Sequence, residues 1–417
     1  MIVRRALTAL AAVMLVAGCT PSPVTSPPAS GAVPIPTTTP AKAWSVSVDK
    51  VGDPGKNHDL GGIDLGTQVP GTVFVRAVGM DGIVVTAMRA SDGSVVWQKQ
   101  DPNWNACVAV SGTPTIACLT DSVITTLSGV DGSTIQTITS PVTPLADAIV
   151  QGDGAIVLSY PRDAAAPSTF SIAKVNAAGV TWRHDESIVP GDTNVPSLTA
   201  STTLINTHTV ATDNSPLVYQ ASDGSPWKVA QQGTPTLLPN GDVSLSGLDG
   251  TSTLQPDGTL IMTEYGDARA PETTDRSAAD LPLFFYEEFS GTSGLASYSA
   301  KGAASWQVAT WNNIASYCGG LLVVTDDSNV GALDPATGKQ IWKKPITIAD
   351  GRGIDCDGVH AVVQTGAAGD ANEKVEWLNM SDGASQFTVQ PAPGNWISGL
   401  TSAGLVVMDG ETITLYK

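Results

Sequence analysis

Short runs of aliphatic and β-branched residues recur along most of the chain, and glycine, proline, aspartate or asparagine lies near the ends of each run. Clear examples cover residues 72–75, 83–86, 155–158, 321–324 and 405–408. These runs have the length of β-strands, and no window places apolar residues at the spacing of an amphipathic helix over several turns. The pattern therefore predicts an all-β chain.

A glycine turn divides these predicted strands into repeats. Five turns are followed three or four residues later by a tryptophan, in the pairs Gly93 and Trp97, Gly179 and Trp182, Gly224 and Trp227, Gly302 and Trp306, and Gly338 and Trp342. Gly132 and Gly383 repeat the turn without the tryptophan. From Gly93 onward the glycines are spaced by 39, 47, 45, 78, 36 and 45 residues, and Gly258 divides the long interval.

A period of this length in a chain of strands is typical of a β-propeller with one four-stranded blade per repeat. We expect the glycine to provide the positive φ of a hairpin turn, and the tryptophan to fill the gap between neighbouring blades from the outer strand. The chain has seven clear turn units, a terminal unit and a short extra unit at Gly258, so the turns alone are compatible with seven, eight or nine blades. One irregular blade is expected between Gln231 and Thr310, with a long polar loop over residues 266–280.

The two ends of the predicted propeller can pair. The last segment divides into three strands, at 397–404, 405–409 and 411–416, so the final blade lacks its outer strand. Residues 43–48 (AWSVSV) can supply that strand, and Trp44 opens it as a tryptophan opens the other outer strands. Closure by this N-terminal strand would remove an unpaired sheet edge.

The N-terminus predicts export. Arg4 and Arg5 precede the apolar run 6–17, which is too short to span a bilayer as a helix but suits a signal peptide. The run ends in Val-Ala-Gly-Cys, which resembles a bacterial lipobox; the alternative is an ordinary secretory signal. The resemblance implies cleavage after residue 18 and lipidation of Cys19, which would anchor the protein to the extracytoplasmic side of a bacterial membrane.

The segment that follows predicts a tether. Of residues 20–42, 15 of 23 are proline, serine or threonine, a composition that cannot bury a core and favours extended conformations. The chain is thus expected to comprise a signal peptide (1–18), a lipidated cysteine with a disordered tether (19–42) and a propeller domain (43–417).

Four further cysteines predict two disulfides, because exported proteins commonly pair their cysteines. Cys107 and Cys118 are placed opposite each other by a hairpin centred on Gly112 and Thr113. Cys318 and Cys356 lie in similar local sequences. Of the three possible pairings, local geometry favours 107–118 and 318–356. The cysteine spacing and the scattered histidines do not suggest a zinc site.

Residues 332–342 (ALDPATGKQIW) match the pattern Ala-x-Asp-x-x-Thr-Gly-x-x-x-Trp, with Asp334, Gly338 and Trp342 at its defined positions. This segment resembles the repeat of pyrroloquinoline-quinone-type (PQQ-like) propellers, and the other repeats are degenerate copies of it. The resemblance implies eight blades, the familiar number for this family. The family contains quinoprotein dehydrogenases and the non-enzymatic propeller lipoprotein of the outer-membrane β-barrel assembly machinery. With a lipobox and a single propeller, the chain is more similar to the second kind.

Composition and motifs narrow the function. Charged residues make up 14% of the chain and its net charge is −18, which argues against nucleic acid as a partner. The chain has no adjacent cysteines of the kind that often cover the quinone in family enzymes, and no serine-nucleophile or phosphate-binding motif. We therefore expect no cofactor and no catalysis, but a membrane-anchored module that binds or scaffolds envelope proteins. The alternative is a quinone-dependent or carbohydrate-active enzyme with a site in the central funnel.

Overall fold

The computed structural model describes residues 40–417 with gaps. The longer gaps are 53–58, 161–168, 189–195, 270–282, 349–353, 367–372 and 391–395; the shorter ones are 64, 66–67, 80, 111, 202, 239, 248–249, 265–266, 290–291, 300, 327, 347, 357–359, 402 and 409–411. The signal peptide, Cys19 and nearly all of the predicted tether lie outside the described residues.

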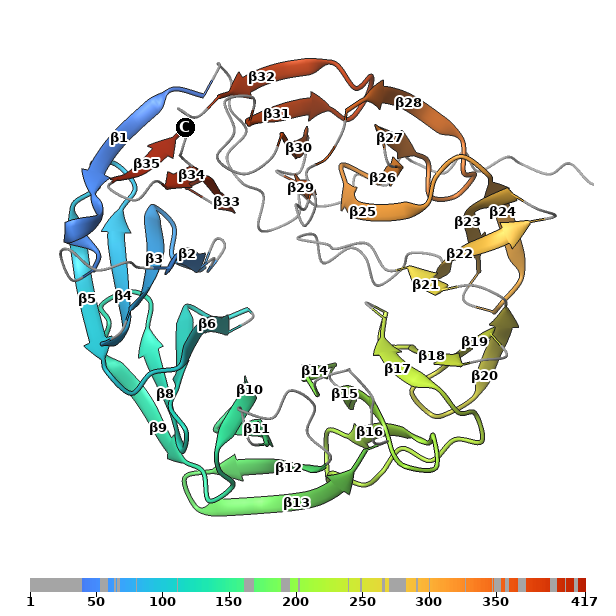
Figure 1. The fold of residues 1–417 in the computed structure, drawn as a ribbon, viewed down its shortest axis with the longest axis horizontal. Helices are drawn as coiled ribbons and strands as arrows, with labels where there is room; N and C mark the ends of the chain where they lie inside the picture. The colour runs from blue at the N-terminus through green and yellow to red at the C-terminus, as the bar shows by residue number, and fades with distance from the viewer. Residues whose placement is uncertain are drawn as a thin grey trace, which may run out of the picture.

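Nine antiparallel sheets follow one another around a ring (Figure 1), and we number them as blades in chain order. Blades 1 to 4 are formed by β2 (Asp59–Ile63), β3 (Thr72–Gly79), β4 (Gly82–Arg89) and β5 (Val95–Asp101); β6 (Ala106–Val110), β7 (Thr115–Leu119), β8 (Val123–Ser128) and β9 (Thr134–Thr139); β10 (Leu145–Gln151), β11 (Gly154–Ser159), β12 (Thr169–Asn176) and β13 (Gly179–Ser187); and β14 (Thr199–Ala200), β15 (Leu204–Val210) and β16 (Pro216–Gln220).

Blades 5 to 8 are formed by β17 (Thr234–Leu237), β18 (Val243–Gly247), β19 (Gly250–Leu254) and β20 (Leu260–Glu264); β21 (Asp267–Arg269), β22 (Leu283–Phe289), β23 (Thr292–Tyr298) and β24 (Ala304–Val308); β25 (Asn313–Cys318), β26 (Leu321–Asp326), β27 (Asn329–Leu333) and β28 (Gln340–Pro345); and β29 (Ile354–Cys356), β30 (His360–Thr365), β31 (Lys374–Asn379) and β32 (Ser385–Val389). Blade 9 joins β33 (Trp396–Thr401), β34 (Gly404–Met408) and β35 (Thr412–Tyr416) to β1 (Lys42–Ser47).

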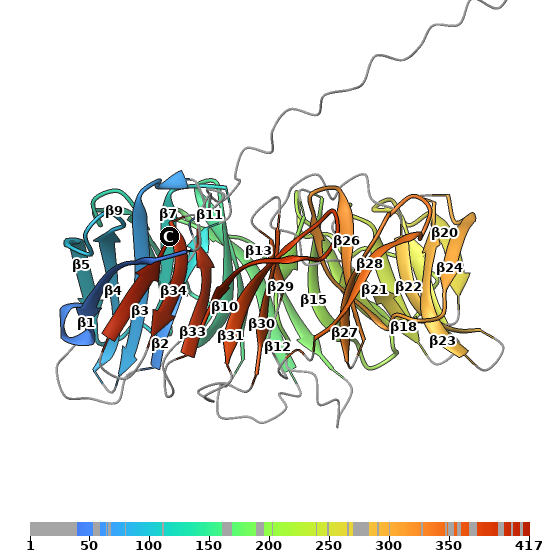
Figure 2. The same cartoon turned by 90° about the horizontal axis from the view of Figure 1, so that it is seen from above.

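In blades 1 to 8 the first strand lies nearest the centre of the ring and the last strand lies toward its outside; in blade 9 β33 is innermost and β1 outermost (Figure 1). The strands cross the thickness of the ring when it is seen from the side (Figure 2). A short 3₁₀ helix, η1 (Val48–Lys50), follows β1. The predicted all-β propeller of four-stranded blades is confirmed: eight sheets have four strands, and blade 4, with three, is an additional ninth.

The prediction of one irregular blade between Gln231 and Thr310 is wrong, because this interval contains two complete sheets, blades 5 and 6. The turn at Gly258 is a genuine repeat turn: its φ is 87° and its N–H donates to the carbonyl of Gln255 over 2.8 Å. The first part of the predicted loop at 266–280 forms strand β21, and residues 270–280 lie outside the described residues. A missing tryptophan after Gly258 concealed this repeat.

Blade 4 lacks a regular outer strand because its chain leaves the sheet after a single bridge. Tyr219 pairs with Pro226 in this bridge, and the N–H of Trp227 donates to the carbonyl of Val218 over 2.8 Å. The side chain of Trp227 is nevertheless buried, against Leu204, Val218 and residues of blade 5. One anchored tryptophan therefore takes the place of a complete strand.

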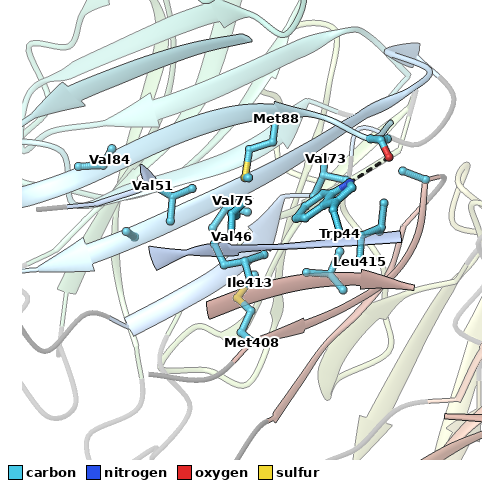
Figure 3. Packing of buried hydrophobic residues seen from close by; sticks show 14 residues of the cluster. Trp44, Val46, Val51, Val73, Val75, Val84, Met88, Met408, Ile413 and Leu415 are labelled. Atoms are coloured by element: carbon cyan, nitrogen blue, oxygen red, sulfur yellow. Dashed lines mark hydrogen bonds between the residues drawn. The ribbon is translucent and has the colours of Figure 1, made fainter. Parts of the chain in front are cut away.

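The N-terminal strand closes the ring, as predicted. Strand β1 pairs antiparallel with β35, from Lys42 opposite Tyr416 to Ser47 opposite Thr412. The buried cluster at this closure joins Trp44 and Val46 of β1 to residues of blades 9 and 1 (Figure 3). The indole N–H of Trp44 donates to the carbonyl of Ala90 in blade 1 over 3.0 Å. A strand from one end of the chain thus contacts both the last blade and the first.

We expect Trp44→Ala to lower the free energy of unfolding by about 3–5 kcal/mol, because it removes a buried ring and leaves a cavity at the closure. Lys42→Ala is the matched control: Lys42 is exposed on the same strand, so its effect should stay within about 0.5 kcal/mol. Denaturant unfolding of the two variants measures the difference. Similar small effects would show that the ring does not depend on this contact.

Candidate functional site

The blade junctions share one hydrogen bond. At five junctions a tryptophan near the start of an outer strand, or at the equivalent place in blade 4, donates its indole N–H to a backbone carbonyl in a turn of the next blade. The pairs are Trp44 and Ala90 (3.0 Å), Trp97 and Gly129 (3.0 Å), Trp227 and Pro256 (2.9 Å), Trp306 and Pro335 (2.9 Å), and Trp342 and Met380 (2.8 Å). Each bond satisfies a buried donor and sets the position of one blade against the next.

At four of the five junctions the glycine of the acceptor turn makes room for the tryptophan ring; at the Trp227 junction Gly258 faces Val229 instead. A Cβ atom at Gly132 would lie 2.7 Å from the ring of Trp97, and one at Gly338 would lie 2.6 Å from the ring of Trp306. Both glycines also have positive φ, at 70° and 66°. The glycine is therefore needed for the turn and for the close approach of the preceding blade. Sequence reasoning found only the first of these reasons.

The aspartate side chains of the turns accept hydrogen bonds from backbone N–H groups of the same turn. Asp223 and Asp257, each directly before its glycine, accept a hydrogen bond from the backbone N–H two residues on, Ser225 and Thr259, over 2.9 Å. This backbone bond lowers the pKa of both carboxyl groups. In the best-matching repeat Asp334 lies earlier and accepts from the N–H groups of Ala336 and Thr337. The aspartates therefore stabilise turns.

An extra residue precedes the tryptophan position in the outer strands. The register shifts between Lys42 and Trp44 in β1, opposite Ala87 and Met88 in β5, and opposite Ala332 and Leu333 in β28. Such bulges bend a strand and redirect the next side chain. Here the next side chain is the tryptophan that reaches the neighbouring blade. The sequence analysis did not predict these bulges.

Some junctions depart from the pattern. In blade 2 Gln136 takes the tryptophan position and donates to the carbonyl of Asp153. Trp182 packs on Gly224, but its buried indole N–H has no partner, and the Nε2 of His184 contacts the carbonyl of Gly224 at 2.7 Å instead. Gly302 faces the backbone of Ile261 rather than a ring, and a Cβ atom added at Gly179 would meet nothing within 4 Å.

Two disulfides join the pairs that the sequence predicted. Cys107 and Cys118 lie directly opposite each other in β6 and β7, and their Cα atoms are 4.1 Å apart. Cys318 and Cys356 link the innermost strands of blades 7 and 8, with Cα atoms 5.5 Å apart. The second bridge therefore connects neighbouring blades covalently.

A buried ion-pair cluster also connects blades 7 and 8. Glu376 is 6% exposed, and its carboxylate accepts from Lys344 of blade 7 (3.0 Å), Lys374 (2.6 Å) and Ser385 (2.8 Å). Burial opposes ionisation of this carboxyl group, but the hydrogen bonds from Lys374, Lys344 and Ser385 outweigh burial and lower its pKa to about 2. The cluster is shared between two blades.

Burial also shifts the pKa values of Tyr219 and His208. Burial, followed by a 2.7 Å hydrogen bond to Glu186, raises the pKa of Tyr219. Burial lowers the pKa of His208, which has a φ of 56° and contacts the hydroxyl of Thr199 at 2.9 Å. These groups lie in or beside blade 4 and do not form one cluster. Within the described parts of the chain, no three histidine, cysteine or acidic residues are grouped so that they could hold a metal ion.

The family comparison agrees with this repeat geometry. Residues 292–416, from blade 6 to the end of blade 9, match the family profile described as outer membrane protein assembly factor BamB. This segment carries the PQQ-like repeat. The resemblance inferred from residues 332–342 is confirmed there, and the same segment contains the Trp306 and Trp342 junctions.

The structural comparisons concern the fold alone. BamB from Moraxella catarrhalis is 15% identical, with a TM-score of 0.44 and coverage of 91% of this chain and 99% of that chain. A quinohemoprotein alcohol dehydrogenase from Pseudomonas putida HK5 is 12% identical, with a TM-score of 0.41 and coverage of 91% and 76%. A eukaryotic initiation factor is 8% identical, with a TM-score of 0.56 and coverage of 82% and 90%. A search of curated proteins found no significant match.

The junction glycines offer a direct test. Gly338→Ala should destabilise the protein by about 1–3 kcal/mol more than Gly152→Ala, because the added methyl would overlap the ring of Trp306. Gly152 is the matched control: its φ of 59° imposes a similar backbone strain, but nothing lies within 4 Å of an added Cβ. Denaturant midpoints measure both. Equal destabilisation would mean that only backbone strain matters at Gly338.

The Glu376 cluster predicts a pH dependence. Because the pKa of Glu376 is lower in the folded protein than its ordinary value of 4.5, its ionisation stabilises the fold above about pH 4.5, and this contribution is lost as the pH falls toward 2. Glu376→Gln should therefore cost about 2–3 kcal/mol near neutral pH and much less near pH 2. Asp185→Asn, which removes an exposed ion pair with Arg183, is the control. A pH-independent difference in unfolding free energy would contradict the assignment.

Proposed function

We propose that this protein is an exported, membrane-anchored lipoprotein whose propeller binds or scaffolds other proteins of the cell envelope without catalysis. The observation that carries the proposal is the match of residues 292–416 to the BamB assembly-factor family. A role in organising envelope proteins is consistent with that family's description, and the partner need not be the same.

Features of the propeller support a binding role. Five of the tryptophans donate to the next blade at the junctions, and the carboxyl group with the strongly lowered pKa, Glu376, is held by Lys344 of blade 7 and Lys374 of its own blade. What varies from blade to blade is the outer surface, where exposed aliphatic side chains are concentrated in blades 1 and 2. A rigid ring with variable outer strands is suited to presenting a surface to another protein.

Export and anchoring have separate support. Two disulfides are typical of proteins that fold outside the cytoplasm. No helix among the residues with described positions is long and apolar enough to cross a membrane. We assign attachment to a lipid on Cys19, at the end of the lipobox-like segment, with residues 20–42 as the tether to the propeller.

Metabolic labelling tests the anchor. We expect labelled palmitate on the wild-type protein and none on Cys19→Ala, because the thiol of Cys19 is the proposed acceptor. The variant should also leave the membrane fraction or remain as an uncut precursor. Ser22→Ala, in the adjacent segment, is the control and should label normally. Equal labelling of wild type and Cys19→Ala would reject the anchor.

Crosslinking tests the binding role. Purification of the tagged protein after crosslinking of intact cells should recover a defined envelope protein in a reproducible ratio. The enzyme alternative predicts a different result, namely a thermal shift and dye reduction after addition of pyrroloquinoline quinone with calcium. Activity with the added quinone, without a recovered partner, would replace the binding proposal by the enzyme.

A further inference from the structure

Exposed aliphatic residues gather where blades 1 and 2 meet at the outside of the ring. Val95 and Val96 of β5 are each 42% exposed, Val130 is 63% exposed and Ile135 of β9 is 59% exposed. The junction bond brings them together: Trp97, next to Val96, donates to the carbonyl of Gly129, next to Val130. We call these four valine and isoleucine residues the rim patch. The outer strands of both blades are neighbours in Figure 1.

Val130 is not required by its turn. The equivalent position, two residues before the turn glycine, is Ser91, Ser222, Ala336 or Ser381 in other repeats. A small or polar residue therefore serves the same turn elsewhere. The exposed valine has no packing role that would explain it, and exposed apolar groups that cluster are typical of contact surfaces.

Strand β9 is an unprotected sheet edge. It is the last strand of blade 2, and its sequence, TIQTIT, contains no charged residue and no proline. The other outer strands that expose aliphatic side chains carry charges: Lys99 and Asp101 in β5, Arg183 and Asp185 in β13, Glu264 in β20, and Lys343 and Lys344 in β28. Strands β24 and β32 are uncharged but expose no large aliphatic residue among those described.

The register of β9 leaves hydrogen-bonding groups facing outward. Thr139 pairs with Val123, and the N–H of Ser140 donates to the carbonyl of Ser122 over 2.7 Å. In an antiparallel ladder this phase directs the N–H and C=O groups of Gln136 and Ile138 toward β8, and those of Thr137 and Thr139 away from it. An added strand could bond to Thr137 and Thr139 without disturbing the blade.

We propose that the outer edge of β9 and the rim patch bind an extended, uncharged segment of another envelope polypeptide, which pairs with β9 as a fifth strand of blade 2. The inference rests on the proposed binding function and names the surface that performs it. Main-chain bonds to β9 would supply affinity, and β-branched side chains of the partner would pair with Thr137 and Ile135. A second copy of this chain is disfavoured as the occupant, because the chain is strongly acidic, with a net charge of −18 before the proposed removal of residues 1–18, and two copies repel each other.

A synthetic probe tests the surface in solution. The probe is a short capped peptide of alternating threonine and valine with a neutral solubilising tail, and its binding is measured by calorimetry against the purified protein. We expect saturable binding to wild type and at least about tenfold weaker binding to Thr137→Pro, which removes an outward N–H. Ile135→Lys, which puts a charge on the edge, should weaken binding similarly. Because it introduces no proline into the strand, a loss of binding in this variant cannot be attributed to the folding defect that a proline could cause.

The matched control is Thr388→Pro, at the equivalent position of the uncharged strand β32, where no aliphatic patch is exposed. It should bind the probe like wild type, and a probe methylated on alternate backbone nitrogens should not bind. No binding to wild type, binding of the methylated probe, or equal loss in Thr388→Pro would each overturn the proposal.

A concentration-dependent dimer abolished by Ile135→Lys would show that a second copy is the occupant. If Ile135→Lys still crosslinks to its envelope partner in cells, the proposed binding function is supported but the assignment of the binding site to β9 is wrong.

Discussion

Each blade in this ring covers the faces of its neighbours, so the fold depends on there being no terminal blade. Strand β1 meets this requirement, because it pairs with β35 and places Trp44 against blade 1. Without it, blade 9 would end at β35 with an unpaired edge, and the cluster shared by blades 9 and 1 would lose the apolar side chains of β1. The closure links residues at opposite ends of the chain.

The ring closure and several other blade junctions use the same tryptophan contact. A bulge redirects a tryptophan from an outer strand, a glycine turn in the next blade receives the ring, and a backbone carbonyl accepts its N–H. Not every junction has the tryptophan contact, since in blade 2 Gln136 takes the tryptophan position. The junction of blades 7 and 8 has a disulfide and the Glu376 cluster in addition to its tryptophan. The ring therefore tolerates variation at single junctions because several kinds of contact can join neighbouring sheets.

The difference between the junction residues and the outer strands suggests which part of the propeller binds other proteins. The junction residues are committed to holding blades together, whereas the outer strands differ in charge and exposed apolar area without changing the fold. Most outer strands that expose aliphatic residues also carry charges, which discourage pairing with other chains. Strand β9 lacks this protection, and the apolar residues beside it continue onto blade 1. A binding function fits an edge that is open in this way.

The sequence by itself determined the features that arise from neighbouring residues. Strand lengths, aspartate–glycine turns and the 107–118 hairpin all follow from local backbone preferences, and residues 332–342 carry the resemblance to PQQ-like propeller repeats. The match of residues 43–48 to the missing outer strand was also predictable, because a four-stranded repeat left one strand absent. The tertiary structure alone decided the number of blades, since the Gly258 repeat lacks its tryptophan and blade 4 lacks its outer strand. It also decided which carbonyl each indole contacts, the bulges and the environment of Glu376, because these depend on how residues far apart in the sequence pack across a blade junction.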